Sequence, residues 1–241
     1  QAFEAVKDAL LDPQYGAIKD LSEVSAIGHR VVQGGSYFNK SVLVTDDVVS
    51  SENIPDRRGI AGDFFVFKVA GAKAATGADL DEVVAAAQKA NDNTRSMGVA
   101  MSSATLPAKG GTIFDMEDGD MEIGMGIHGE PGIRRGKIDT ADNVIDEIME
   151  PILKDLPYVE GDEVYVLVNS LGATPLIDLH VCYRRVAQIL EEKGIKVYKA
   201  LVGPFACSMD MAGMSVTLMK LDDELKELMD APCDTPYFTQ K

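Results

Sequence analysis

The chain has few cysteines, and none of them has the spacing of a metal or redox site. Its three cysteines, Cys182, Cys207 and Cys233, are widely separated among 241 residues. An odd, scattered set is typical of reduced thiols and argues against a disulfide framework or a zinc site. We therefore assign these side chains to packing, and we expect a cytoplasmic protein without a bound metal.

Long apolar runs are missing as well. No uninterrupted apolar stretch is long enough to cross a bilayer, and the first residues lack a positively charged region followed by an apolar core. Membrane insertion and secretion therefore have no support. The chain begins at Gln1 in a helix-like segment, residues 2–11, from which we expect that an upstream portion is missing.

Positive charge is scarce. The chain has 23 Lys and Arg against 39 Asp and Glu, which gives a formal net charge of −16. Such an acidic chain is a poor partner for nucleic acid or anionic membranes, because a local basic patch would have to overcome the overall field. Each of its arginine pairs could bind a phosphate or an acidic partner, although a solvated face with salt bridges is commoner. These pairs are Arg57-Arg58, Arg134-Arg135 and Arg184-Arg185.

Nucleotide-binding loops are also absent. The sequence contains neither Gly-x-x-x-x-Gly-Lys-Ser/Thr nor a Gly-x-Gly-x-x-Gly between a strand and a helix. We therefore expect the chain to bind no nucleotide cofactor itself. The acidic run that starts at Asp222 suits the N-terminus of a helix and needs no metal to explain it.

Helix and strand patterns alternate along the chain, which predicts an α/β protein with mixed sheets and flanking helices. Asp79 and Glu82 have the spacing of a capping box, and Pro151 predicts a kink or break. Helices are expected over residues 59–76, 80–95, 139–156 and 175–194. Strands are expected over 41–44, 98–102, 163–168, 195–202 and 214–219.

An alternating strand from Met121 runs into a glycine-rich turn that ends at Ile133 and holds His128 beside Glu130. Glycines remove side chains, so a small ligand could approach both the backbone and the imidazole ring. The histidine could serve as a base, a nucleophile or a ligand, with Glu130 orienting its ring or accepting a proton. The alternative is that His128 merely caps the strand. The glycines are Gly124, Gly126, Gly129 and Gly132.

Two further loops are candidate functional sites. The loop over residues 169–175 follows a buried strand, at the edge where open α/β sheets bind ligands. Its Asn169 and Thr174 could contact a ligand or partner, or could simply cap the helix that follows. In the polar loop over 205–213, Asp210 is the candidate carboxylate.

The segment from Met121 to Ile133 resembles the signature of the substrate-binding subunit of dihydroxyacetone kinases. The resemblance extends to other motifs in the same order. They are Arg57-Arg-Gly-Ile-Ala-Gly62, Asn93-Thr-Arg-Ser-Met-Gly-Val-Ala100, Val168-Asn-Ser-Leu-Gly-Ala-Thr-Pro175, Tyr183-Arg-Arg-Val-Ala187, Ser208-Met-Asp-Met-Ala-Gly213, Leu221-Asp-Asp-Glu-Leu225 and Asp230-Ala-Pro232.

The resemblance implies that His128 adds to the ketone carbon of dihydroxyacetone and forms a covalent hemiaminal, with Gly126, Gly129 and Glu130 binding the substrate or supporting the turn. Capture of this kind selects short ketoses and aldoses over glycerol, which has no carbonyl group. The resemblance also implies a homodimer and a separate kinase subunit that holds ATP, or ADP with magnesium, for transfer to the terminal hydroxyl.

The resemblance covers residues 41–241 and weakens before them. Family members carry an earlier Gly-Ser-Gly-His-Glu-Pro segment and a Thr-Gly-Asp segment, and neither occurs here; His29 lacks the flanking residues of the first. We expect residues 1–96 to be a partial N-terminal α/β kinase domain and residues 97–241 a lid-like C-terminal α/β domain. The alternative function is a catalytically inactive ketose-binding paralogue that acts as a regulator or coactivator.

Overall fold

A computed structural model describes residues 47–51, 57–108, 110–127 and 129–241, together with residues 11, 13, 19 and 20. The expected strand over 41–44 and nearly all of the expected helix over 2–11 lie outside these residues, as does His29.

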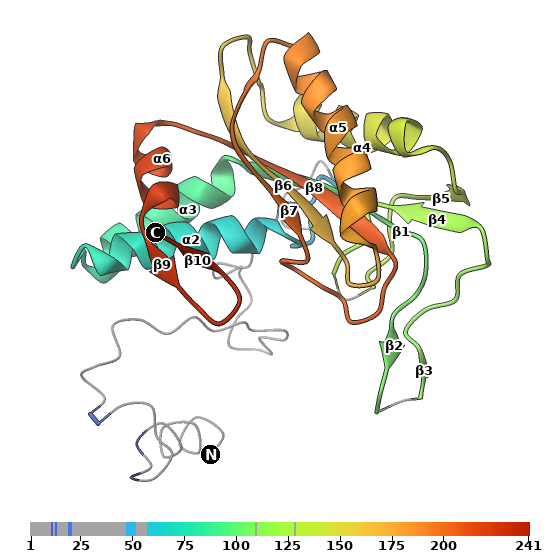
Figure 1. Ribbon diagram of the computed structural model, residues 1–241, viewed down its shortest axis with the longest axis horizontal. Coiled ribbons are helices and arrows are strands. Elements are labelled where there is room, and N and C mark those ends of the chain that lie inside the picture. Colours follow the sequence, from blue (N-terminus) through green and yellow to red (C-terminus); the bar gives the residue numbers. More distant parts are fainter. Residues whose placement is uncertain are drawn as a thin grey trace.

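A six-stranded mixed sheet forms the centre of the fold (Figure 1), in the order β5-β4-β1-β8-β6-β7. β6 and β7 are parallel, whereas all other neighbouring pairs are antiparallel. The α/β class with mixed pairing is therefore confirmed. The strands are β1 (Thr94–Ala100), β4 (Asp120–Ile123), β5 (Arg134–Lys137), β6 (Glu163–Ser170), β7 (Lys196–Gly203) and β8 (Gly213–Lys220).

Helices cover both faces of this sheet (Figure 1). In β6, Val164, Val166 and Val168 pack into one core cluster with α4 (Ala141–Asp155) and α5 (Leu176–Glu192). The alternate side chains Tyr165 and Leu167 pack into a second cluster on the other face. That face carries α2 (Gly62–Ala75), α3 (Leu80–Asp92) and α6 (Asp223–Asp230). The near-continuous apolar run of β6 thus belongs to a strand buried on both faces, as predicted.

The apolar segment after Gly59 forms α2, as predicted, and its first turn is capped by a distant side chain. The Asp47 carboxylate is buried and accepts hydrogen bonds from the amides of Ile60 (3.2 Å) and Gly62 (3.0 Å). A carboxylate suits this position because the amides at a helix N-terminus are unpaired and carry partial positive charge.

The predicted capping box starts α3, since the Glu82 amide donates to Asp79 Oδ1 and the Asp79 amide donates to Glu82 Oε2, each at 2.9 Å. The predicted end near Arg95 is wrong, because α3 stops at Asp92 and β1 begins at Thr94. All residues of β1 pair with β8, and this pairing outweighs the helical spacing. The expected domain boundary after residue 96 falls inside β1, and the division into two domains stays a prediction.

Pro151 lies inside α4, which continues past it to Asp155. The predicted break is therefore wrong, and the alternative of a kink stays a prediction. Ile148, Met149 and Ile152 are buried around the proline, and their packing offsets the hydrogen bond that the helix loses there.

Short hairpins complete the described chain. β2 (Thr105–Leu106) and β3 (Gly111–Thr112) project from the body of the molecule (Figure 1). β9 (Cys233–Asp234) and β10 (Thr239–Gln240) form the second hairpin. None of the helices in the described part of the chain is long and apolar enough to cross a membrane.

Candidate functional site

The glycine-rich turn begins where β4 leaves the sheet. β4 ends at Ile123, earlier than the alternating pattern predicts, and Gly124 turns the backbone with a φ of +80°. The Gly124 amide still donates to the Gly98 carbonyl at 2.8 Å, so the start of the turn remains fixed to β1. Met125 and Ile127 beyond the strand are buried in the same core cluster as Ile123. These side chains hold the first half of the turn against the core.

His128 lies outside the described residues, and its role stays a prediction. The residues around it are held closely together. The Gly129 amide donates to the Gly126 carbonyl (3.1 Å), and the Gly126 amide donates to the Glu130 carbonyl (3.2 Å). A Cβ atom at Gly126 would overlap Glu130 Oε2, so the turn folds this carboxylate back over the Gly126 backbone. The structure therefore brings Gly126, Gly129 and Glu130 together.

At two of these glycines, neighbouring protein atoms lie too close to the backbone for any side chain. Gly129 has a φ of +84°, and a Cβ atom there would lie 2.7 Å from Ile113 Cδ1 and 3.1 Å from Phe114 Cδ1. A Cβ atom at Gly132 would overlap the Ile123 carbonyl oxygen. Protein atoms thus occupy the space that glycine leaves at both positions. Whether the turn also contacts a ligand stays a prediction.

A buried carboxylate on β4 holds the far end of the turn. Glu122 is 6% exposed, and its Oε1 accepts a hydrogen bond from the Gly132 amide at 2.6 Å. Its Oε2 accepts hydrogen bonds from Arg135 Nε at 2.9 Å and Nη2 at 2.5 Å. The bond to Glu122 raises the pKa of Arg135 above its ordinary value, which keeps the guanidinium charged. Sequence reasoning missed this pair, although Glu122 and Arg135 are opposite in the β4–β5 register.

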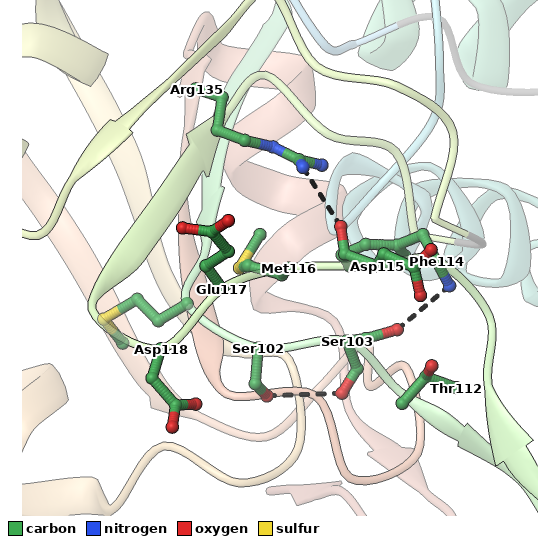
Figure 2. A pocket seen from close by; sticks show the side chains of 10 residues that line it. Ser102, Ser103, Thr112, Phe114, Asp115, Met116, Glu117, Asp118 and Arg135 are labelled. Carbon is green, nitrogen blue, oxygen red and sulfur yellow. Dashed lines mark hydrogen bonds between the residues drawn. The ribbon is translucent and has the colours of Figure 1, made fainter.

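A hollow of about 460 Å³ lies beside the turn. Figure 2 shows the Arg135 side chain reaching the Asp115 carbonyl, to which it donates at 3.0 Å, and the Ser103 hydroxyl accepting from the Phe114 amide at 3.1 Å. Phe114, which forms part of the wall of this hollow, lies close to the turn, because a Cβ atom at Gly129 would be 3.1 Å from Phe114 Cδ1. The lining residues are Met101, Ser102, Ser103, Thr112, Phe114, Asp115, Met116, Glu117, Asp118 and Arg135.

Hydroxyl and carboxylate oxygens line the hollow together with the apolar side chains of Met101, Phe114 and Met116, and Arg135 is the cation among the lining residues. Oxygens of this kind accept hydrogen bonds from the hydroxyl groups of a small polyol or sugar. Among the described residues, no group of three or more His, Cys, Asp or Glu side chains could hold a metal ion.

The loop after β6 is held by its own side chains. Asn169 is fully buried, and its Oδ1 accepts from the amides of Phe205 (2.8 Å) and Ala206 (2.7 Å). Thr174 Oγ1 bonds to both the carbonyl and the amide of Gly213. The proposed helix-capping role of these two residues is therefore wrong, since α5 starts after Pro175 without a side-chain cap.

Asp210 supports the projecting hairpin. Its Oδ1 accepts a hydrogen bond from the Thr105 amide at 2.6 Å. This backbone hydrogen bond lowers the pKa of the Asp210 carboxyl below its ordinary value. The carboxylate therefore ties the loop over 205–213 to β2.

Arg134 pairs with Glu147, Arg184 with Asp142 and Arg185 with Asp146 at the surface, as the commoner interpretation predicts. Arg57 also forms a salt bridge, to Asp155, but its side chain is buried, so the predicted solvated face is wrong there. The three cysteines are free, and burial raises the thiol pKa of Cys182 and Cys207. A raised pKa lowers the thiolate fraction. Cys182 and Cys233 are partly buried, as their assignment to packing predicts, whereas Cys207 is exposed.

Comparison with known proteins agrees with this fold. A Dak1 domain model matches residues 26–237. The chain is 59% identical over 199 residues to the dihydroxyacetone-binding subunit of PTS-dependent dihydroxyacetone kinase 2 from Listeria innocua, covering 83% of this chain and 60% of that protein. The chain therefore spans about 60% of the length of this relative.

Two solved structures share the fold. The dihydroxyacetone kinase of C. freundii has a TM-score of 0.73 at 30% identity, over 82% of this chain and 36% of that one. A dihydroxyacetone kinase operon co-activator has a TM-score of 0.71 at 28% identity, over 78% of this chain and 59% of that one. As its motifs predict, the chain belongs to the Dak1 domain family.

Proposed function

We propose that this chain belongs to the dihydroxyacetone-binding subunit of a dihydroxyacetone kinase and that His128 captures the ketose covalently. The observation that carries this proposal is the compact turn in which Gly126, Gly129 and Glu130 surround the position of His128 in the sequence. The similarity to a dihydroxyacetone-binding subunit, at 59% identity, supports the substrate.

Capture would proceed by addition to the carbonyl group. The unprotonated imidazole nitrogen of His128 donates its electron pair to the ketone carbon, and the carbonyl electrons move to the oxygen. The new alkoxide takes up a proton, while the other ring nitrogen loses one. Glu130 is the carboxylate in the turn that could accept this proton. The product is a neutral hemiaminal whose terminal hydroxyl remains free for phosphorylation to dihydroxyacetone phosphate.

The phosphoryl group would come from a nucleotide on a partner subunit. Transfer to a bound hydroxyl depends mainly on positioning and on neutralising the charge of the phosphates. We therefore place ATP, or ADP with magnesium, on a separate kinase subunit, and we propose a homodimer that works in the cytoplasm. This chain would supply the orientation of the acceptor hydroxyl.

Calorimetric titration of the full chain with dihydroxyacetone tests the capture. We expect saturable binding of dihydroxyacetone, no binding of glycerol, and loss of binding in His128→Ala. The matched control is His180→Ala, since His180 is an exposed residue of α5. Unchanged affinity in His128→Ala would overturn the role of this histidine.

A ketose-binding regulator without kinase activity is the second candidate. The observation that favours it is the similarity to the operon co-activator, at a TM-score of 0.71. Adding a kinase subunit with its nucleotide and measuring dihydroxyacetone phosphate separates the two candidates. Turnover supports the kinase, whereas His128-dependent binding without turnover supports the regulator.

A further inference from the structure

The Glu122 carboxylate joins segments that enter and leave the turn. It projects from β4, which leads into the turn, and accepts a hydrogen bond from the Gly132 amide at the end of the turn (2.6 Å). Its second oxygen accepts two hydrogen bonds from Arg135 of β5. A buried carboxylate needs such partners, so the bond from the Gly132 amide constrains the backbone of the turn and the bonds from Arg135 fix its guanidinium group.

Arg135 extends the connection to the wall of the hollow. Its Nη1 donates to the Asp115 carbonyl at 3.0 Å (Figure 2). Phe114, the preceding residue, lies close to the turn, since a Cβ atom at Gly129 would be 3.1 Å from Phe114 Cδ1. The segment around Phe114 therefore lies close to the turn at Gly129 and is bonded to β5 through Arg135.

The end of the turn has little freedom to move away from Glu122. A Cβ atom at Gly132 would lie 2.9 Å from Glu122 Cγ and would overlap the Ile123 carbonyl oxygen. The Ile133 amide also donates to that same Ile123 carbonyl, at 2.8 Å. The Glu122 carboxylate adds a side-chain link from the Gly132 amide to the Arg135 guanidinium, which in turn bonds to the wall at Asp115.

We propose that Glu122 and Arg135 are positioning residues, which hold the turn carrying His128 against the wall of the hollow in the geometry needed for ketose capture. The effect on capture rests on the proposed function, whereas the effect on the turn does not. A displacement of about 1 Å in a reacting group reduces a rate by roughly a hundredfold, so a small shift of the turn is enough to weaken capture.

Glu122→Gln tests this proposal, because the amide keeps an oxygen for Gly132 but loses the charge that holds Arg135. The matched control is Arg134→Ala, which removes the neighbouring salt bridge of β5 to Glu147. Three quantities are measured for each variant of the full chain. They are the midpoint of thermal unfolding, the rate of backbone amide exchange over residues 124–133 without ligand, and the affinity for dihydroxyacetone.

In Glu122→Gln, we expect amide exchange over 124–133 to accelerate by about tenfold and affinity for dihydroxyacetone to fall by at least about tenfold. Arg134→Ala should leave the amide exchange and the affinity for dihydroxyacetone unchanged, and the midpoints of thermal unfolding of the two variants should be similar. Arg135→Lys keeps the charge but loses the planar fork, so it should give intermediate values.

Wild-type exchange and affinity in Glu122→Gln would overturn the proposal. If the unmodified chain binds no dihydroxyacetone, the proposed function fails, and exchange alone then decides the positioning role. If Glu122→Gln does not fold, Arg135→Gln replaces it, because the Arg135 side chain is 46% exposed and Glu122 keeps its hydrogen bond from the Gly132 amide. Unchanged exchange in Arg135→Gln would likewise overturn the proposal.

Discussion

Arg57 and Asp155 pair through two hydrogen bonds, Nη1 to Oδ2 at 2.8 Å and Nη2 to Oδ1 at 2.5 Å, although 98 positions separate them in the sequence. Arg95 of β1 also donates to the same carboxylate. The Arg57 side chain is 3% exposed and that of Asp155 is 20% exposed. One carboxylate at the end of α4 thus joins β1 to the segment before α2.

Asp155→Asn should destabilise the chain by about 2 kcal/mol at pH 7, because it leaves two guanidinium groups without their counter-ion in a largely buried place. The hydrogen bond from Arg57 is the main cause that lowers the pKa of Asp155. A lowered pKa in the folded state stabilises the fold above the unfolded-state value, and this stabilisation is lost as the pH falls through the folded-state value.

Urea unfolding at several pH values measures this effect. The difference between the unmodified chain and Asp155→Asn should be full at pH 7 and should shrink below about pH 4. Asp146→Asn is the control, because the Asp146 side chain is 48% exposed in its pair with Arg185. Equal effects of the two substitutions at pH 7 would contradict the prediction.

Gly129→Ala should displace the turn and weaken binding of dihydroxyacetone. Gly77 has nearly the same φ, +83° against +84°, but a Cβ atom at Gly77 would meet nothing within 4 Å. Both substitutions carry the strain of a left-handed backbone, about 1 kcal/mol. Only Gly129→Ala adds contacts with Ile113 and Phe114. Calorimetry should therefore show weaker binding in Gly129→Ala alone, and equal affinities would contradict this account.

Asn169→Ala should destabilise the chain by about 3 kcal/mol, because it leaves the amides of Phe205 and Ala206 without their acceptor and opens a small cavity. Amide exchange should accelerate mainly over residues 204–212. Asn143→Ala provides the comparison, since Asn143 is exposed and bonds only within the start of α4. A destabilisation below that of Asn143→Ala would show that Asn169 does not hold the loop.

The elements that the sequence predicts correctly are those whose stabilising contacts lie within the element itself. The Asp79–Glu82 capping box and the apolar run of β6 are examples, because each forms among neighbouring residues or within one strand. Arg95 and Pro151 show the limit. Pairing with β8 makes Arg95 part of a strand, and burial around Pro151 keeps α4 continuous.

The sequence predicts which segment forms the candidate site, but it does not predict which distant residues pack against that segment. The glycines and Glu130 are adjacent in sequence, so their grouping follows from the turn itself. The approach of Phe114 to Gly129 and the hydrogen bond from Arg135 to Asp115 bring together segments that are separate in the sequence, and no local pattern predicts that they are neighbours. Glu122 was missed because a charged residue in an alternating strand is normally assigned to the solvent face.

The central position of β8 also affects how the chain folds. β8 lies between β1 and β6 in the sheet, yet it is the last of the six strands to be synthesised. The part with β1, β4 and β5 and the part with β6 and β7 have no shared strand pairing until residues 213–220 are available. Distant contacts of this kind slow folding, and we therefore expect the joining of the two parts to be a late step in forming this sheet. Until then, both parts expose an unpaired edge, at which association between chains competes with folding.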